Sequence, residues 1–288
     1  MSQSDIKKAF ILGHPVKQTR SPLIHGFWLK QFGLEGRYEA IDLLPEALDD
    51  FLSGIATSGY AGGNVTAPHK EQTFRFLLDK GQLTQTARRI GAVNTLYLEN
   101  GVLTGDNTDA PGFIANLDQV LGANWPDSMR HCLVLGAGGA ARAVLSGLLD
   151  RISCPIWLAN RTRQKAEILQ AFDDTRIQVI DWDEVSNAMA ECDLIVNTTS
   201  LVMNKDNVAL PFSFSSAGKN AIAADIVYAP LETAFLKEAK ACGLRTVDGL
   251  GMLLHQAVPG FSRWFGNVPE VTPDLRAFIE QDLNQKNK

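Results

Sequence analysis

The sequence predicts a two-domain α/β protein, with a discontinuous N-terminal α/β domain that has a mixed sheet and a second domain that has a doubly wound parallel sheet. Short apolar runs alternate with amphipathic stretches along most of the chain, as strands and helices do in α/β folds. A glycine-rich turn at 136–141 separates one apolar run from one helical stretch. Helical stretches at 252–265 and 273–283 follow the last expected strand, and we expect them to return to the first domain. The predicted domains are therefore 1–108 with 249–288, and 109–248.

Composition excludes several classes of protein. The 288 residues, 45% hydrophobic and 20% charged, suit one large or two medium globular domains. The net charge of −5, without a basic block, argues against nucleic acid or an anionic membrane as a partner. No apolar run reaches the roughly 18 residues that cross a bilayer, and the N-terminus has no apolar signal core. The four cysteines form no CxxC pair, so we expect reduced thiols in a cytoplasmic protein.

The first domain is predicted from the alternation of strand and helix. A strand at 9–12 precedes Ser21-Pro22, which opens a helix with serine as N-cap and proline at the first helical position. Asn100-Gly101, between two short apolar runs, predicts a hairpin at the edge of the sheet. The other expected strands are 37–42 and 60–65, and the other expected helices are 45–55, one from Pro68, and 109–121, which leaves the domain.

The second domain is organised around residues 131–162. An apolar strand at 132–135, the glycine turn, a helix at 140–150 and a strand at 156–159 give the strand–turn–helix–strand order of a dinucleotide-binding, Rossmann-type unit. Gly136 permits the tight turn, Gly138 lets the backbone approach a pyrophosphate at the helix N-terminus, and Ala141 permits close helix–strand packing. The pattern continues with strands expected at 176–180, 193–197, 221–226 and 245–247, and a helix at 231–242.

The end of the second strand of this unit indicates the cofactor. An acidic residue at this position binds the ribose 2′-hydroxyl of NAD, whereas a basic residue suits the 2′-phosphate of NADP. Here Asn160-Arg161-Thr162 is followed by Arg163 and Lys165, without a carboxylate. A guanidinium pairs with phosphate and also stacks on adenine. The sequence therefore favours NADP over NAD.

Polar clusters follow several strand ends and turns, where a cleft between the domains would collect them. Their hydroxyls and amides outnumber charges, which suits a small polyhydroxylated substrate, and Ser21 at a helix start suits a carboxylate. The clusters are 19–21, 64–70, 94–95, 105–109 and Gln256.

Hydride transfer to or from a secondary alcohol also needs a proton donor or acceptor at the oxygen. Lys70 and Asp109 are the candidates, although each has a simpler interpretation, as a solvated lysine in a first helical turn and as a helix N-cap. Tyr228 either points into the cleft or packs in the core. The histidines, His25 among them, are expected to be structural. No spacing suits a metal site, so no metal is expected.

These residues resemble the shikimate dehydrogenase family over nearly the whole chain. The matching motifs are Ser21-Pro22 with His25, NVTAPHK (64–70), GAVNT (91–95), GDNTD (105–109), GAGGA (136–140), NRT (160–162), NTTS (197–200) and DGLGM (248–252). The resemblance implies reversible, NADPH-dependent reduction of 3-dehydroshikimate to shikimate in aromatic amino acid biosynthesis.

The resemblance also implies roles for individual residues. Lys70 and Asp109 form the catalytic acid–base pair, with Lys70 exchanging the proton at the substrate C3 oxygen. The implied substrate-binding residues are Thr19, Ser21 and Tyr228 at the carboxylate and Thr66, Asn94, Asp109 and Gln256 at the ring hydroxyls, with Lys70. The implied cofactor-binding residues are Gly136, Ala137, Gly138, Gly139, Ala140, Asn160, Arg161, Thr162, Gln85, Ile226, Gly249 and Met252.

Two positions depart from the family pattern. Leu201-Val202-Met203 follows the NTTS motif where the family commonly has a glycine, and Gln85 stands where the family often has an acidic residue. The alternatives are a quinate/shikimate dehydrogenase of broader cofactor use, an NADP-sensing regulator without turnover, and an enzyme of the methylene-tetrahydrofolate dehydrogenase type. The NAD-dependent form predicts a carboxylate near Arg161, and the regulator predicts loss of Lys70 or Asp109. The assembly is expected to be a monomer or a homodimer.

Overall fold

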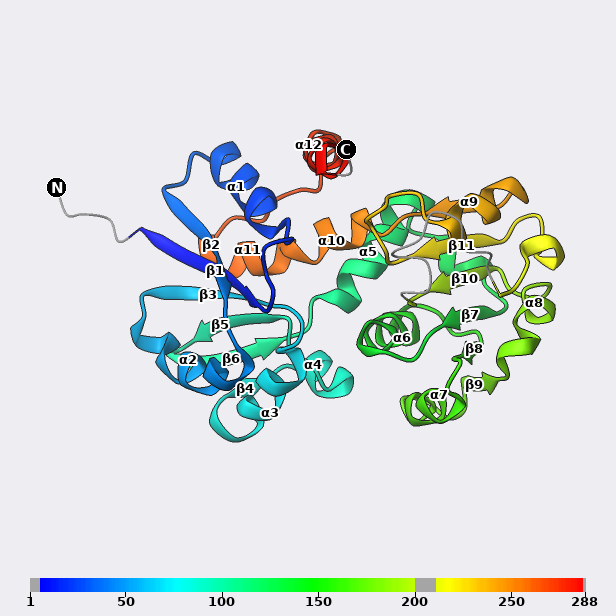
Figure 1. Cartoon of the computed structure of the whole chain (residues 1–288), viewed down its shortest axis with the longest axis horizontal. Coiled ribbons are helices and arrows are strands. Elements are labelled where there is room, and N and C mark those ends of the chain that lie inside the picture. Colours follow the sequence, from blue (N-terminus) through cyan, green and yellow to red (C-terminus); the bar gives the residue numbers. More distant parts are fainter. Residues whose placement is uncertain (1–5, 200–210, 287–288) are drawn as a thin grey trace. The chain divides into compact units, whose positions relative to one another are not determined.

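The computed structural model describes residues 6–199 and 211–286, so Ser200 and Leu201-Val202-Met203 lie outside the described residues (Figure 1). Its contacts divide the chain into two compact units, one of Met1–Thr108 with Gln256–Lys288, and one of Asp109–His255. The predicted α/β class with two sheets is confirmed. The described part of the chain contains no helix with the length and apolar character that crossing a membrane requires.

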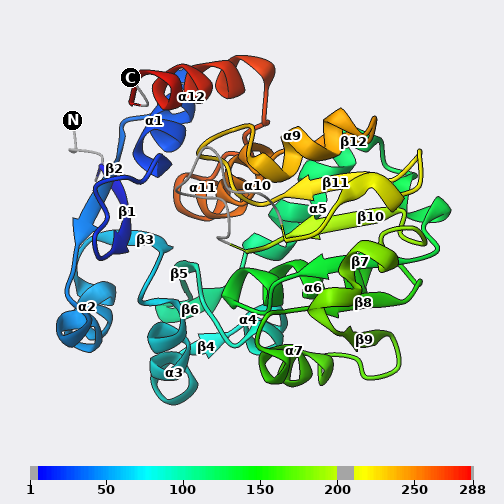
Figure 2. The same cartoon turned by 45° about the vertical axis from the view of Figure 1, so that its right-hand side comes forward.

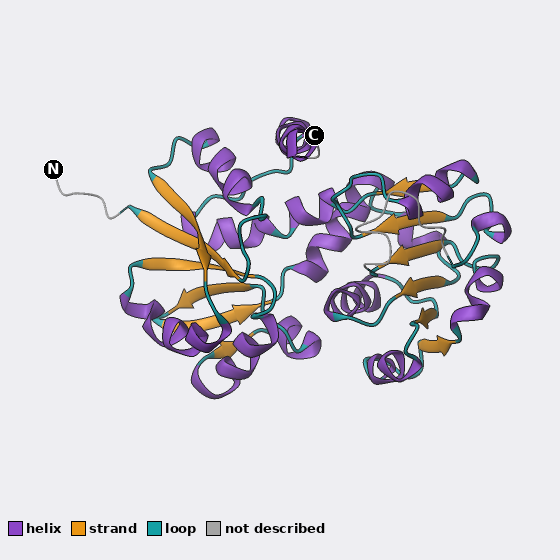
Figure 3. Ribbon diagram, viewed as in Figure 1, coloured by secondary structure: helices purple, strands orange, loops and turns teal. Residues whose placement is uncertain are grey.

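The first unit contains a six-stranded mixed sheet in the order β2-β1-β3-β5-β6-β4, whose labels Figure 1 gives. Figure 3 draws the strands in orange. β1 pairs in parallel with β2 and β3, whereas β5 is antiparallel to β3 and β6. The strands are β1 (Lys7–Gly13), β2 (Gly36–Asp42), β3 (Tyr60–Val65), β4 (Gln82–Leu83), β5 (Thr95–Glu99) and β6 (Val102–Asp106). The helices are α1 (Ser21–Gln31), α2 (Leu48–Gly54), α3 (Lys70–Lys80), α4 (Gln85–Ile90), α11 (Ala257–Phe265) and α12 (Pro273–Lys286).

The hairpin at Asn100-Gly101 is present, and both residues have positive φ, 52° and 79°, as a tight two-residue turn between twisted strands requires. The prediction that this hairpin forms the edge of the sheet is wrong, because the short strand β4 pairs in parallel with β6 and lies outside it. Two paired residues are too few to leave a period-two pattern in the sequence.

The prediction that Ser21 caps α1 is also wrong. Ser21 is the first helical residue, Arg20 occupies the N-cap position, and no side chain caps the helix. The Ser21 hydroxyl instead accepts a hydrogen bond from Thr19, and Pro22 lies in the first turn but is the second helical residue rather than the predicted first. The helix start is therefore fixed by proline and by tertiary contacts rather than by a serine cap.

The second unit contains a six-stranded sheet in the order β12-β11-β10-β7-β8-β9, and every pair is parallel (Figure 2). The strands are β7 (Cys132–Leu135), β8 (Ile156–Ala159), β9 (Ile177–Ile180), β10 (Leu194–Asn197), β11 (Ile222–Asp225) and β12 (Arg245–Val247). The helices are α5 (Asp109–Leu121), α6 (Gly139–Arg151), α7 (Arg163–Gln170), α8 (Val185–Ala188), α9 (Ala234–Ala241) and α10 (Leu250–His255). The order reverses between β7 and β10, and such a switch point is where open α/β sheets bind ligands.

Both faces of this sheet are covered. Cys132 and Val134 of β7 belong to a core cluster with α5, α6 and α7, whereas Leu133 and Leu135 belong to a second cluster with α8 and α9. Successive side chains of a strand point to opposite faces, so one uncharged apolar run supplies both cores.

The stretch 252–265 is not one helix. It divides at Gln256 into the end of α10 and α11. α10 contacts α5 in the second unit, whereas α11 contacts β1, β3 and β5, and α12 contacts α1, in the first. The second unit therefore extends to His255 rather than to the predicted limit at 248.

Candidate functional site

Thr19 and Ser21, the predicted carboxylate-binding residues, lie together at the start of α1. The Thr19 hydroxyl donates to Ser21 Oγ at 3.2 Å, and the Ser21 amide donates to Thr19 Oγ1 at 3.3 Å. The Tyr38 hydroxyl donates to Asn64 Oδ1 at 2.6 Å. Burial raises the pKa of Tyr38 well above its usual value, and a hydrogen bond with Ser21 partly opposes that rise. A partly buried chain of polar groups thus connects the two hydroxyls to the end of β3.

Asn94, predicted to hold a substrate hydroxyl, is part of a buried polar network. Its side-chain oxygen accepts from the Thr108 amide at 2.8 Å, and its carbonyl accepts from Asn64 Nδ2 at 3.1 Å. The Thr108 hydroxyl donates to the Gln256 carbonyl at 2.8 Å. Asn64, Asn94 and Thr108 are at most 4% exposed. The network therefore holds the Gln256 backbone, far along the chain, beside Asn94.

Lys70 is the first residue of α3, and its carbonyl accepts from the Val93 amide at 3.0 Å. The preceding His69 is fully buried, with Nε2 2.7 Å from the Leu43 carbonyl oxygen. Thr66 is half-buried at the end of β3, where its amide donates to the Leu12 carbonyl at 2.9 Å. Asp109, the first residue of α5, is half-buried and directly follows the anchored Thr108. The acid–base pairing of Lys70 with Asp109 stays a prediction.

The glycine turn has the conformation that its sequence predicts. Gly136 has a φ of 108°, and a Cβ there would lie 2.6 Å from Thr198 Oγ1, so both backbone and space require glycine. A Cβ at Gly138 or Gly139 would meet no atom within 4 Å. Gly138 is the N-cap of α6 and has no side-chain cap, and Ala141 is fully buried. The α6 amides therefore face open space that suits a phosphate.

A cavity of about 250 Å³ adjoins this turn. Asn160 and Arg161 follow β8 there, and Asn160 Nδ2 donates to the Thr162 carbonyl at 2.8 Å. The lining residues are Gly136, Ala137, Gly138, Asn160, Arg161, Thr162, Lys165, Trp182, Thr198 and Thr199. Gly139 and Ala140 begin α6 but do not line the cavity. No carboxylate is among the lining residues.

The three basic residues after β8 differ in their surroundings. Arg163 is paired with Glu167 at 3.0 Å and with Asp181 at 2.5 Å. Within residues 6–199 and 211–286, Arg161 and Lys165 form no ion pair, and both line the cavity. Two cations and uncapped amides around one cavity fit the phosphates of NADP.

Ile226, Gly249 and Met252 lie together in the second unit. A Cβ at Gly249 would lie 2.3 Å from the Ile226 carbonyl oxygen, so this close approach requires glycine. Ile226 and Met252 are partly buried against the same core cluster. Tyr228, half-buried, follows this segment. The remaining predicted cofactor residue, Gln85, is exposed at the start of α4 in the first unit.

Asp225 orders the segment that carries Ile226 and Tyr228. It is 2% exposed, and it accepts hydrogen bonds from Thr233 Oγ1 at 2.7 Å, from Asn197 Nδ2 at 3.0 Å and from the Val227 amide at 3.0 Å. Burial raises the pKa of Asp225, and these three bonds oppose the rise. Asp225 is not among the residues predicted from the sequence, although a carboxylate that ends an apolar strand is a usable signal.

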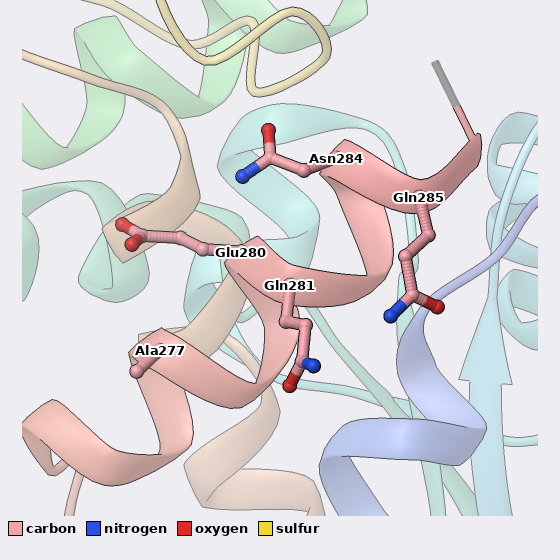
Figure 4. Close-up of a pocket in the computed structure, with 5 residues that line it drawn as sticks. All are labelled: Ala277, Glu280, Gln281, Asn284 and Gln285. Carbon is pink, nitrogen blue, oxygen red and sulfur yellow. The ribbon is translucent and has the colours of Figure 1, made fainter. Parts of the chain in front are cut away.

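A second cavity of the described residues lies in the first unit. It has a volume of about 350 Å³, lies along α12 and is lined by Ala277, Glu280, Gln281, Asn284 and Gln285 (Figure 4). All five side chains project from one helix, so they contact only one side of a ligand. Among the described residues, no three His, Cys, Asp or Glu side chains form a group that could hold a metal.

The parallel sheet with its glycine turn, joined to a unit with buried hydroxyls and amides, defines the class of dinucleotide-dependent dehydrogenases. The model "Shikimate dehydrogenase substrate binding domain" matches residues 11–96, and the model "Shikimate / quinate 5-dehydrogenase" matches residues 123–227. The chain belongs to the shikimate dehydrogenase (NADP⁺) family.

Relatives match over nearly the full length. The shikimate dehydrogenase (NADP(+)) of Brucella abortus (strain S19) is 51% identical over 96% of this chain and 95% of its own, and that of Methylobacterium radiotolerans is 53% identical over 96% and 97%. The crystal structure of shikimate 5-dehydrogenase from Thermus thermophilus with NADP(H) and shikimate is 36% identical, with a TM-score of 0.82 over 97% of this chain and 99% of that one.

Proposed function

We propose that this chain catalyses the reversible reduction of 3-dehydroshikimate to shikimate with NADPH, in aromatic amino acid biosynthesis. The observation that carries the proposal is the match of both units to one family of NADP-dependent enzymes over nearly the whole chain. Lys70 and Asp109, which a regulator without turnover would not need, are present. The assembly is proposed to be a monomer or a homodimer, which sedimentation distinguishes.

The cofactor is proposed to bind along the carboxyl edge of the parallel sheet. The open amides of α6 bind the pyrophosphate, and Arg161 with Lys165 binds the 2′-phosphate. Ile226, Gly249 and Met252 contact the nicotinamide end. NADPH, when bound, supplies the hydride for the substrate carbonyl carbon.

The acid–base step is proposed for Lys70 and Asp109. The Lys70 ammonium donates a proton to the C3 oxygen in reduction, and the neutral amine accepts it in oxidation. Asp109 orients the ammonium and stabilises its charge. The Lys70 carbonyl is bonded to Val93, and the neighbouring Asn94 is bonded to Thr108. Asp109 is one residue beyond Thr108, about 3.8 Å along the Cα trace, which supports this pairing.

The substrate is proposed to be held mainly by neutral groups. Thr19 and Ser21, with Tyr228, bind the carboxylate, because paired hydroxyls at an uncapped helix start suit an anion. Thr66, Asn94, Asp109 and Gln256 bind the ring hydroxyls. The network around Thr108 fixes Asn94 and the Gln256 backbone before substrate arrives, which lowers the entropy cost of binding.

The test is a spectrophotometric assay that follows formation of the reduced cofactor, NADPH or NADH, in four mixtures: shikimate or quinate, each with NADP or NAD. We expect shikimate with NADP to give the highest kcat/KM. Equal rates with quinate and with NAD would favour the alternative, a quinate/shikimate dehydrogenase of broader cofactor use, which the family description includes. Absence of turnover in all four mixtures, with folded protein, would refute the proposal.

A further inference from the structure

Trp182 lines the cavity beside Arg161 and the glycine turn, and the roles above do not use it. It begins a short helical turn, Trp182–Glu184, that directly follows β9. β9 is parallel to β8, so both strands end at the same edge of the sheet. Arg161 and Trp182 thus approach one cavity from the ends of two neighbouring strands.

The turn that carries Trp182 is held firmly. Asp181 and Glu184 form a capping box, in which the Asp181 amide donates to Glu184 Oε2 at 2.9 Å. Arg163 Nη1 donates to Asp181 Oδ1 at 2.5 Å, which connects the turn to the start of α7. α7 also packs on β9 (Figure 1). Arg163 therefore positions the indole, while Arg161 and Lys165 remain directed to the cavity.

The indole of Trp182 is half-buried, and part of its surface borders the cavity. Its only aromatic contact within the described residues is with Phe212, at a centroid distance of 6.1 Å and an interplanar angle of 69°. Trp182 also packs against the core cluster beneath α8 and α9, so one side of the indole meets the core while the half-buried side chain keeps a part that reaches the cavity. The part of the indole that lines the cavity is available to a flat ligand there.

We propose that Trp182 forms the adenine-binding face of the cofactor site. This inference rests on the proposed function, because NADP supplies the adenine. An indole face stacks on any base, and the cations beside it select the phosphate next to that base. Trp182 thus contributes adenine affinity irrespective of the 2′-phosphate, whereas Arg161 contributes discrimination between NADP and NAD.

The experiment uses two cofactor fragments, 2′,5′-ADP and 5′-AMP, with the full chain. Titration calorimetry gives Kd, and tryptophan emission reports stacking directly. We expect Trp182→Leu to raise Kd for both fragments about tenfold, and Trp182→Phe to raise it less, because phenylalanine retains a ring. We expect Arg161→Ala to raise Kd for 2′,5′-ADP far more than for 5′-AMP.

Fluorescence provides a matched control. Of the five tryptophans in the sequence, Trp182 alone among the described residues lines this cavity. Trp157 lies on β8 and does not line this cavity, so Trp157→Phe is the control. The tryptophan emission of the wild type and of Trp157→Phe should decrease when 2′,5′-ADP binds, whereas that of Trp182→Phe should not. Unchanged affinity in both Trp182 variants, or quenching that persists without Trp182, would overturn the inference.

This outcome is separable from the proposed function. A wild type that turns over shikimate, with Trp182 variants that bind both fragments normally, refutes the stacking role alone. A wild type that binds 2′,5′-ADP with Trp182-dependent quenching but turns over no substrate supports the stacking role and refutes the activity.

Discussion

His25 is expected to make the protein sensitive to acid, and His25→Phe should remove that sensitivity. The side chain is fully buried on α1, and its ring is stacked on Tyr38 with centroids 4.0 Å apart. Neither ring nitrogen has a hydrogen-bond partner in the described part of the chain. Burial lowers the pKa of His25 from 6.5 to about 3, and the nearby Asn64 partly opposes the shift.

The sign and size of the effect follow from proton binding. Between pH 6.5 and about 3 the unfolded chain binds a proton at this imidazole and the folded chain does not, so the free energy of unfolding falls as the pH decreases through that window. Each pH unit well inside the window removes about 1.4 kcal/mol. The unfolded imidazole is already half protonated at pH 6.5, so the wild type should lose about 2.3 kcal/mol more than His25→Phe between pH 6.5 and 4.5.

The assay is urea unfolding, followed by tryptophan fluorescence at a series of pH values. His25→Phe keeps an aromatic ring for the stack on Tyr38 and removes the titration. His25→Gln is the matched control, because it removes the titration but keeps polarity. Both variants should show the same shallower dependence on pH, from different absolute stabilities. Parallel curves for wild type and both variants would refute the argument.

Three further outcomes are expected. Lys70→Ala should lower kcat at least about 100-fold with little change in KM, since acid–base groups contribute about 10²–10⁴-fold, and an intact kcat would remove Lys70 from the mechanism. Arg161→Ala should weaken NADP binding far more than NAD binding in calorimetry, and equal losses would show that Arg161 does not recognise the 2′-phosphate. Thr108→Val should lower the free energy of unfolding by about 1–3 kcal/mol, because the buried Gln256 carbonyl loses the hydroxyl that donates to it at 2.8 Å. Thr108→Ser keeps a hydroxyl at this position and should retain most of the wild-type stability in the same urea unfolding experiment.

Short sequence motifs were sufficient to predict secondary structure at positions where few residue types can adopt the required backbone conformation. Asn100-Gly101 predicts its hairpin because only a few residues tolerate positive φ in succession. The segment 132–162 predicts strand, turn, helix and strand. Gly136 adopts the positive φ that a tight turn needs, the short apolar runs indicate strands, and the apolar residues of the helical stretch recur every three to four positions. The basic residues after β8 predicted the NADP preference because β8 pairs in parallel with β7, so the ends of the two strands, and the segments that follow them, lie side by side.

Contacts between segments that are distant in the chain could not be predicted from local sequence patterns. The two-residue strand β4 exists only because β6 offers it an edge, and α10 joins the second unit because α5 offers it a surface. Tyr38 and Trp182 belong to no motif, and the motif that contains Thr108 does not show its partner. Tyr38 bonds to Asn64, 26 positions away, and Thr108 bonds to Gln256, 148 positions away. Arg163 holds the turn of Trp182 through Asp181, 18 positions away.

The sequence by itself therefore determined the fold class, the family and the cofactor, because these depend on short segments whose backbone has few choices. Only the tertiary structure decided which side chains hold those segments in place. Hydrogen bonds and ring contacts between distant segments depend on distances of a few tenths of an ångström, and no local pattern encodes them.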